Sequence, residues 1–176
     1  MIGHSGAYRP DIDGLRAIAV LSVVLFHFGI PGFSGGFVGV DIFFVISGYL
    51  IGGILWREYC DTGTIWLRHF YVRRFRRLLP AFFVMALATT AVAWLLLLPF
   101  EFREYGKMLI ASTVYLSNVL FYRGAGYFDT ASHDKVLLHT WSLSVEEQFY
   151  IFLPLFLLVL MRFRRLAVPL LVLLFA

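Results

Sequence analysis

Apolar runs of bilayer length recur along the chain. They cover residues 15–33, 38–56, 78–100 and 143–161, and each is close to the roughly 20 residues that a helix needs to cross the hydrocarbon core. A fifth run, 166–176, is too short to span. The sequence therefore predicts an all-α, polytopic bundle of transmembrane helices with four to five spans in these 176 residues.

The amino-acid composition also indicates a membrane protein. The chain is 60% hydrophobic, 18% aromatic and only 15% charged, with a mean hydropathy of +0.81, far from the soluble average. A net charge of +4 could indicate a nucleic-acid partner, but the cations gather between the apolar runs instead of spreading over a surface, so we expect none. The single cysteine, Cys60, rules out a disulfide framework within the chain.

The placement of arginines predicts the orientation. Six arginines lie in the link between the second and third runs: Arg57, Arg68, Arg73, Arg74, Arg76 and Arg77. The positive-inside rule places that link in the cytoplasm. The N-terminus is then cytoplasmic, while the turn at 29–39 and the end of the third run near Pro99 are outside. A cleavable signal peptide is not expected, since Asp11 and Asp13 precede the first run.

Segment 104–122 leaves two topologies open, because it is apolar only in part. If it spans, Arg162, Arg164 and Arg165 lie outside. If it is re-entrant or lies on the membrane surface, 143–161 becomes the fourth span and these arginines return to the cytoplasm, which the charge bias favours. Polar backbone at membrane depth must be covered by protein or a wet cavity, so we expect the segment to wall a cavity.

Two ionisable residues share one face of the first run. Arg16 and His27 are eleven residues apart, which places them on nearly the same helical face about 16 Å apart along the axis. Arg16 could instead snorkel to the interface, and His27 could be a buried hydrogen-bonded histidine. The functional reading makes His27 a general base. Asp11 and Asp13 are expected to cap the helix start.

A glycine-rich turn follows and delivers a carboxylate. Gly35, Gly36 and Gly39 permit a sharp turn and a close approach of backbone, and Asp41 then begins the second run. Because the outside turn is short, we expect Asp41 to lie at the depth of His27 and to hold one imidazole nitrogen. The alternative is a simple helix cap.

The arginines at 73–77 are interleaved with aromatic residues. Arg73 and Arg76, and Arg74 and Arg77, are three residues apart and share a helical face. They could bind lipid headgroups or set the topology. The other interpretation is recognition of a phosphorylated ligand, for which the forked guanidinium is well suited.

The stretch 138–150 carries the last cluster. Ser144 and Glu147 have the spacing of a capping box, and Glu146 and Tyr150 share a face. No tight ligand spacing supports a metal site, so none is expected.

Together these four stretches resemble the acyltransferase-3 family of integral membrane O-acyltransferases, which are mostly bacterial. The resemblance rests on Arg16 and His27, on Gly35 to Asp41 with the following Phe43, Phe44, Ser47, Gly48 and Tyr49, on Arg73 to Arg77, and on His139 to Tyr150. It implies about ten spans in the whole membrane domain, of which residues 1–176 would be the N-terminal part. An extracytoplasmic domain sometimes follows.

The resemblance implies transfer of an acyl group, usually acetyl, from cytoplasmic acyl-CoA to a hydroxyl of an extracytoplasmic carbohydrate, such as lipopolysaccharide, exopolysaccharide or cell-wall glycan, at the bacterial cytoplasmic membrane. No permanently bound cofactor is implied. By this likeness His27 would be the catalytic residue, and the donor would be bound by Arg16, Arg73, Arg74, Arg76 and Arg77. We add to the expected catalytic set Asp41, which would orient His27, and Glu146 and Glu147, one of which would help to position the acceptor or the outer pocket. The residues expected at the acceptor or its pocket are His139, Trp141, Ser142 and Tyr150. The rival interpretations are a transporter of a polar or acyl-carrying solute and a lipid-binding scaffold.

Overall fold

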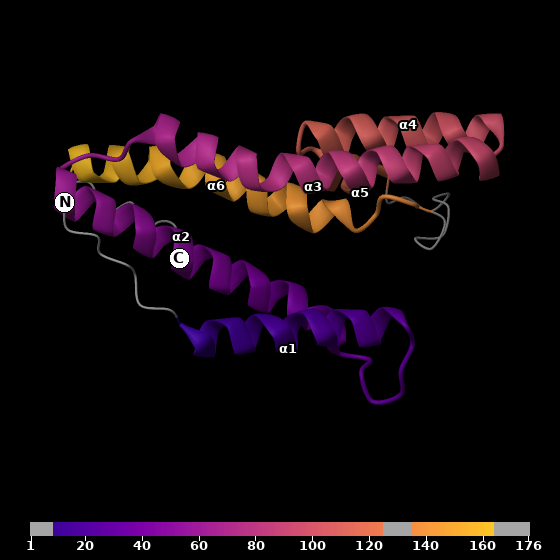
Figure 1. The fold of residues 1–176 in the computed structure, drawn as a ribbon, viewed down its shortest axis with the longest axis horizontal. Helices are drawn as coiled ribbons and strands as arrows, with labels where there is room; N and C mark the ends of the chain where they lie inside the picture. Colours follow the sequence, from indigo (N-terminus) through magenta and orange to yellow (C-terminus); the bar gives the residue numbers. More distant parts are fainter. Residues whose placement is uncertain (1–8, 125–134, 164–176) are drawn as a thin grey trace. The chain divides into compact units, whose positions relative to one another are not determined.

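The computed structural model describes residues 9–124 and 135–163, and these are helical, which confirms the all-α prediction (Figure 1). The elements, in chain order, are α1 (Pro10–His27), the 3-10 helix η1 (Gly36–Val38), α2 (Gly39–Thr62), α3 (Leu67–Leu96), α4 (Pro99–Thr113), α5 (Ser117–Gly124) and α6 (Thr140–Arg162).

Three helices in the described part of the chain are long and apolar enough to cross a membrane: α2, counted from Gly36, α3 and α6. They correspond to three of the four predicted full spans. The first predicted span is shorter than expected, because α1 ends at His27 and carries three charged residues in its first two turns. The run 166–176 lies outside the described residues.

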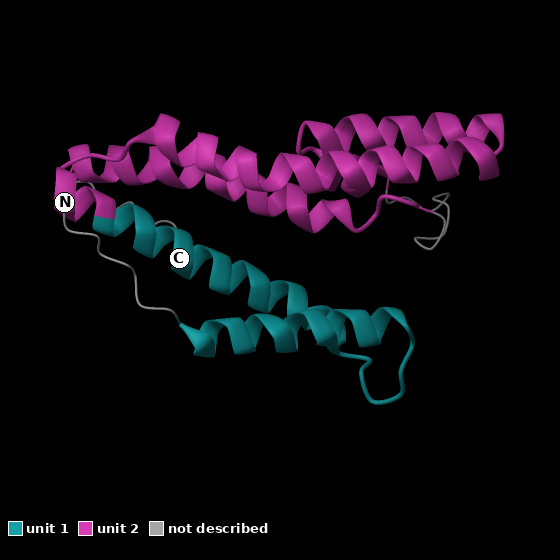
Figure 2. Ribbon diagram, in the orientation of Figure 1, with its two compact units in different colours: residues 1–57 teal, residues 58–176 magenta. Residues whose placement is uncertain are grey.

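The chain divides into two units, with residues 1–57 in the first and the rest in the second, so the boundary falls inside α2 (Figure 2). In the first unit, glycines let the backbones of two elements touch. A Cβ at Gly36 would lie 2.1 Å from the carbonyl oxygen of Ser22, and one at Gly39 would lie 2.4 Å from that of Ala19. The close approach predicted for these glycines is confirmed.

The same contacts fix the register of this hairpin. Gly36 lies against Ser22, Gly39 against Ala19, and the Tyr49 hydroxyl is within 3.5 Å of the Arg9 guanidinium. Each step forward along α2 matches an equal step backward along α1, so the two helices are antiparallel. Segment 28–38 therefore folds back beside the last turns of α1 before α2 begins.

In the second unit, the link before α3 is much shorter than the sequence indicated. Only residues 63–66 separate α2 from α3, Gly63 adopts a positive φ of 72°, and the Trp66 amide donates to Glu58 Oε1 at 3.1 Å. Five of the six arginines expected in a link lie instead in the first three turns of α3, and the sixth, Arg57, lies in α2.

Helices α3 and α6 are antiparallel. Arg74 contacts Glu147, while Tyr71, one turn earlier, donates its hydroxyl to the Ile151 carbonyl, one turn later, at 2.8 Å. Arg162 at the end of α6 is therefore at the same end of the unit as the arginines of α3. This agrees with the re-entrant alternative for segment 104–122; Arg164 and Arg165 lie outside the described residues.

The segment itself is a broken helical hairpin. Helix α4 runs back along α3, as the Tyr105 hydroxyl shows by meeting Thr89 and Thr90 at 3.0 and 2.8 Å. The chain reverses at 114–116, where Tyr115 has a φ of 55°, and α5 returns so that Phe121 lines the same pocket as Phe100 at the start of α4. Segment 104–122 is thus not a fourth crossing helix.

Polar side chains fasten this hairpin to α6. Two hydroxyl pairs are buried, Ser112 with Thr140 at 2.8 Å and Ser117 with Ser144 at 2.7 Å. Gln148 Nε2 donates at 2.7 Å to the Tyr115 carbonyl, which the reversal removes from any regular helix. These polar residues serve helix packing, and the hairpin also walls a pocket of about 360 Å³ beside α3.

Candidate functional site

His27 is the last residue of α1, and its imidazole is exposed. Its Nδ1 lies 2.8 Å from the carbonyl oxygen of Val23, one turn earlier. A carbonyl oxygen only accepts, so Nδ1 carries the proton and donates it. In the neutral ring, Nε2 then holds the free lone pair. The geometry gives a fixed tautomer with a basic nitrogen that can take a proton from a hydroxyl.

Asp41 does not lie beside His27, which corrects the sequence-based expectation. The register that sets Gly39 against Ala19 places Asp41 at the level of Ala17, ten residues before His27 and about 15 Å along the axis. The expectation failed because segment 28–38 folds back along α1 before α2 begins. The orienting contact predicted for Asp41 is made by the Val23 carbonyl instead.

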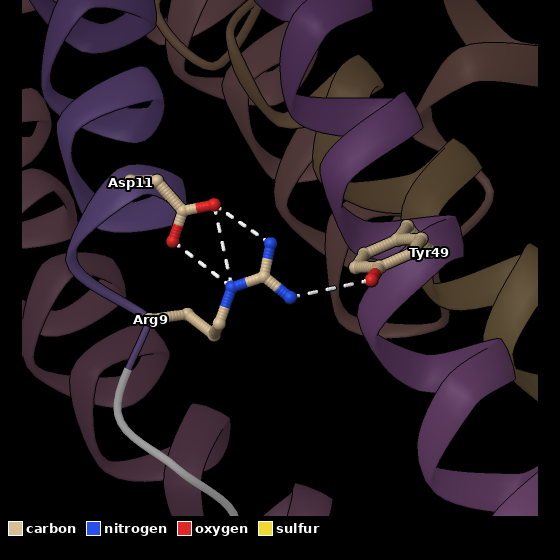
Figure 3. A network of polar contacts seen from close by, with 3 residues as sticks. All are labelled: Arg9, Asp11 and Tyr49. Carbon is tan, nitrogen blue, oxygen red and sulfur yellow. Dashed lines mark hydrogen bonds and ion pairs between the residues drawn. The ribbon is translucent and has the colours of Figure 1, made fainter.

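The start of α1 is held by arginines. The expected capping is wrong, since Arg9 occupies the cap and no side chain caps the helix. Asp11 accepts hydrogen bonds from the Arg9 guanidinium at 2.7 and 2.9 Å, and Arg9 also reaches the Tyr49 hydroxyl (Figure 3). This hydrogen bonding lowers the pKa of Asp11 to about 2. Arg16 is partly buried and lies 3.7 Å from Asp13.

The arginines of α3 separate into two kinds. Arg73, Arg76 and Arg77 are exposed, and within the described residues they form no ion pair. Arg74 is different, because its side chain is only 17% exposed and pairs with Glu147, which is 4% exposed. The first three remain candidates for binding a phosphorylated ligand, whereas Arg74 already has a protein partner.

A compact network surrounds Arg74. Its Nη2 donates to Glu147 Oε1 at 2.8 Å, and its Nε lies 3.2 and 3.3 Å from the two carboxylate oxygens. The Tyr150 ring packs on the guanidinium, with Cζ 3.2 Å from its centroid, and the Tyr150 hydroxyl donates to Glu146. The predicted shared face of Glu146 and Tyr150 is confirmed. The predicted capping box is wrong, since α6 begins at Thr140 and Ser144 bonds Ser117.

The residues expected to form one acceptor pocket lie at two levels of α6. His139, Trp141 and Ser142 are at its beginning, where the Ser142 hydroxyl donates to the His139 carbonyl at 3.1 Å. His139 also lines a small pocket of about 180 Å³ with Phe82 of α3. Tyr150 lies two turns beyond Ser142, is 2% exposed and contacts Arg74, so it does not belong to that pocket.

Two contacts that shape these sites could not be predicted from residue spacing. Arg9 meets Tyr49 across 40 residues, and Arg74 meets Glu147 across 73. Within the described residues, no three His, Cys, Asp or Glu side chains are grouped as metal ligands would be.

The family profile described as the acyltransferase domain, Acyl_transf_3, matches residues 9–176. The chain belongs to the acyltransferase-3 family. Among its relatives, the peptidoglycan O-acetyltransferase OatA of Listeria monocytogenes is 42% identical over 160 residues, which are 90% of this chain and 26% of the relative. A protein of Bacillus subtilis, YrhL, provisionally named a peptidoglycan O-acetyltransferase, is 46% identical over 154 residues, which are 86% of this chain and 24% of the relative.

A Staphylococcus aureus protein provisionally named an O-acetyltransferase is 46% identical over 155 residues, which are 88% of this chain and 25% of the relative. The chain thus spans about a quarter of the length of the curated relatives it matches. No solved structure matches it.

Proposed function

We propose that this chain contributes to a membrane O-acetyltransferase that moves an acetyl group from acetyl-CoA to a hydroxyl of an extracytoplasmic cell-wall glycan. One observation carries the proposal: in a chain of an acyltransferase family, the exposed His27 has Nδ1 bonded to the Val23 carbonyl and so presents a basic Nε2. The glycan acceptor is supported by the names of the Listeria and Bacillus relatives.

In the proposed reaction, the acceptor hydroxyl oxygen attacks the thioester carbonyl carbon while His27 Nε2 takes the hydroxyl proton. A carbon–oxygen bond forms, the carbon–sulfur bond breaks, and the coenzyme A sulfur receives the proton from the imidazolium. Val23 orients the ring throughout, because its carbonyl also stabilises the cationic form of the imidazole.

The positions of the arginines and of the polar residues at the start of α6 suggest roles in binding the donor and the acceptor. The exposed arginines of α3 would bind the donor phosphates from the cytoplasmic side, and Arg16 is a separate candidate for contact with the donor. His139, Trp141 and Ser142 would contact the acceptor at the other end of α6, since α3 and α6 are antiparallel. This assignment puts the N-terminus and Arg162 in the cytoplasm, as the positive-inside rule predicts.

The direct test replaces His27 in the full-length protein, expressed in cells whose own glycan acetylation has been deleted. His27→Ala should lower acetate released from purified cell wall by mild base about 100-fold or more, since general-base catalysis contributes roughly 10²–10⁴. Phe28→Ala is the matched control, because Phe28 is 77% exposed and adjacent. Normal acetylation by a stable His27→Ala protein would rule out the catalytic assignment.

A further inference from the structure

Arg74 differs from its neighbours because its guanidinium already has protein partners. One edge of its guanidinium faces both oxygens of Glu147, and one face is covered by the Tyr150 ring. Tyr150 is in turn held by Glu146. A ligand phosphate that took the place of Glu147 on this edge would displace a carboxylate that is 4% exposed, and removing one partner of such a pair leaves the other charge buried and unpaired.

The pair also sets the rotation of α3. A second contact one turn away, from the Tyr71 hydroxyl to the Ile151 carbonyl, keeps the same face of α3 against α6. Arg74 points toward α6. His69, Arg73 and Arg76 occupy positions i, i+4 and i+7 of α3, so their side chains share a different face of the helix. At about 100° per residue they fall within roughly 60° of one another, on a stripe turned away from Arg74.

The three stripe residues are exposed, and within the described residues they have no hydrogen-bonding or ionic partner. They extend over about 10 Å of the helix axis. Two guanidiniums and an imidazole at that spacing suit a ligand that carries more than one phosphate group, such as the pyrophosphate and sugar phosphate of coenzyme A.

The stripe ends just before the long apolar part of α3. Residues 78–96 of this helix carry no charged side chain, so His69, Arg73 and Arg76 lie on the turns that precede it. The phosphate groups of coenzyme A and those of lipid headgroups are both chemically suited to cations at this position. Competition between the two therefore belongs to the test of the stripe.

We propose that Glu147, supported by Tyr150, withdraws Arg74 from the donor-binding set and uses it to fix the rotation of α3, so that His69, Arg73 and Arg76 bind the phosphates of the donor. Glu147 is then a positioning residue and His69 an additional binding residue. This assignment rests on the proposed acetyl-CoA donor.

The test measures binding of coenzyme A itself to the full-length protein in nanodiscs, together with the KM for acetyl-CoA and kcat. Arg73→Ala with Arg76→Ala should weaken binding at least about tenfold, and His69→Ala about threefold to tenfold, with kcat little changed. Arg68→Ala is the matched control, because it removes one exposed cation from α3 outside the stripe.

The decisive variants concern the pair. Glu147→Leu alone should raise the KM because Arg74 loses its anchor, whereas Arg74→Met with Glu147→Leu should restore the KM to within about threefold of the parent, since an apolar pair can replace a buried ion pair. The swap Arg74→Glu with Glu147→Arg is a second arm in case the apolar pair fails to fold. If either folded double variant loses coenzyme A binding as Arg73→Ala with Arg76→Ala does, Arg74 binds the donor and the proposal is wrong.

Two further arms separate the possible sources of failure. If phosphatidylglycerol in the nanodisc abolishes coenzyme A binding, and an excess of coenzyme A does not restore it, the stripe binds lipid headgroups and the proposal is overturned. If coenzyme A binding depends on the stripe residues but the protein transfers no acetyl group, the proposed function is wrong and the assignment of the stripe to coenzyme A is kept.

Discussion

Each of the two units of this chain has its own kind of internal helix contact. In the first, α1 and α2 meet through backbone, where glycines allow contact with the carbonyls of Ser22 and Ala19. In the second, buried polar side chains join the helices, among them Arg74 with Glu147 and Ser117 with Ser144. The comparison indicates that the unit carrying His27 depends on the absence of a side chain, and the other unit on the pairing of side chains.

The largest expected effect comes from Gly36→Ala. Its new Cβ would lie 2.1 Å from the Ser22 carbonyl oxygen, so the helices must separate, and we expect a loss of about 3 kcal/mol or more in the stability of the hairpin. Hydrogen exchange of the α1 amides should accelerate accordingly. Gly35→Ala is the control, with nothing within 4 Å of its Cβ. Equal exchange in the two variants would show that the close contact does not hold the unit.

An intermediate effect is expected at the Ser117–Ser144 pair. Ser144→Ala leaves the Ser117 hydroxyl buried without its partner, which should cost about 1–2 kcal/mol in the free energy of unfolding in detergent. Changing both residues to Ala should cost less than the sum of the two single changes, because no hydroxyl is then left unpaired. Strict additivity would mean that this bond does not join α5 to α6.

The smallest effect is expected from a polar contact in the first unit. Asp11→Asn should leave thermal stability unchanged between pH 5 and 8, since Arg9 and Asp11 are both exposed. Because the pKa of Asp11 is lowered, any contribution is complete above its ordinary value and is lost only as the pH falls through about 2. A clear loss near neutral pH would remove the contrast between the two units.

Local chemistry in the sequence predicted much of this fold. Apolar length indicated the three spanning helices, and glycine spacing indicated the close contact of α1 with η1. The partial polarity of 104–122 indicated that it need not cross, and the structure has it as a broken hairpin. These features depend on residues near one another in the chain, so periodicity and composition were sufficient.

The candidate site was less predictable, because its contacts join distant residues. Nothing in the spacing of the arginines distinguishes Arg74 from Arg73, and only the antiparallel packing of α6 selects Glu147 as its partner. Asp41 was misplaced for a related reason. The number of residues between His27 and Asp41 is known from the sequence, but the direction in which this segment folds back along α1 is not.

The α4–α5 hairpin determines the direction in which α6 runs. Because it leaves and returns to the same end of α3, the hairpin adds no full-length helix between α3 and α6, and α6 runs in the opposite direction to α3. A straightened helix through Tyr115 would add one crossing and invert α6. The reversal at 114–116, which Gln148 and the pairs Ser112–Thr140 and Ser117–Ser144 fasten to α6, therefore sets the direction of α6 relative to α3.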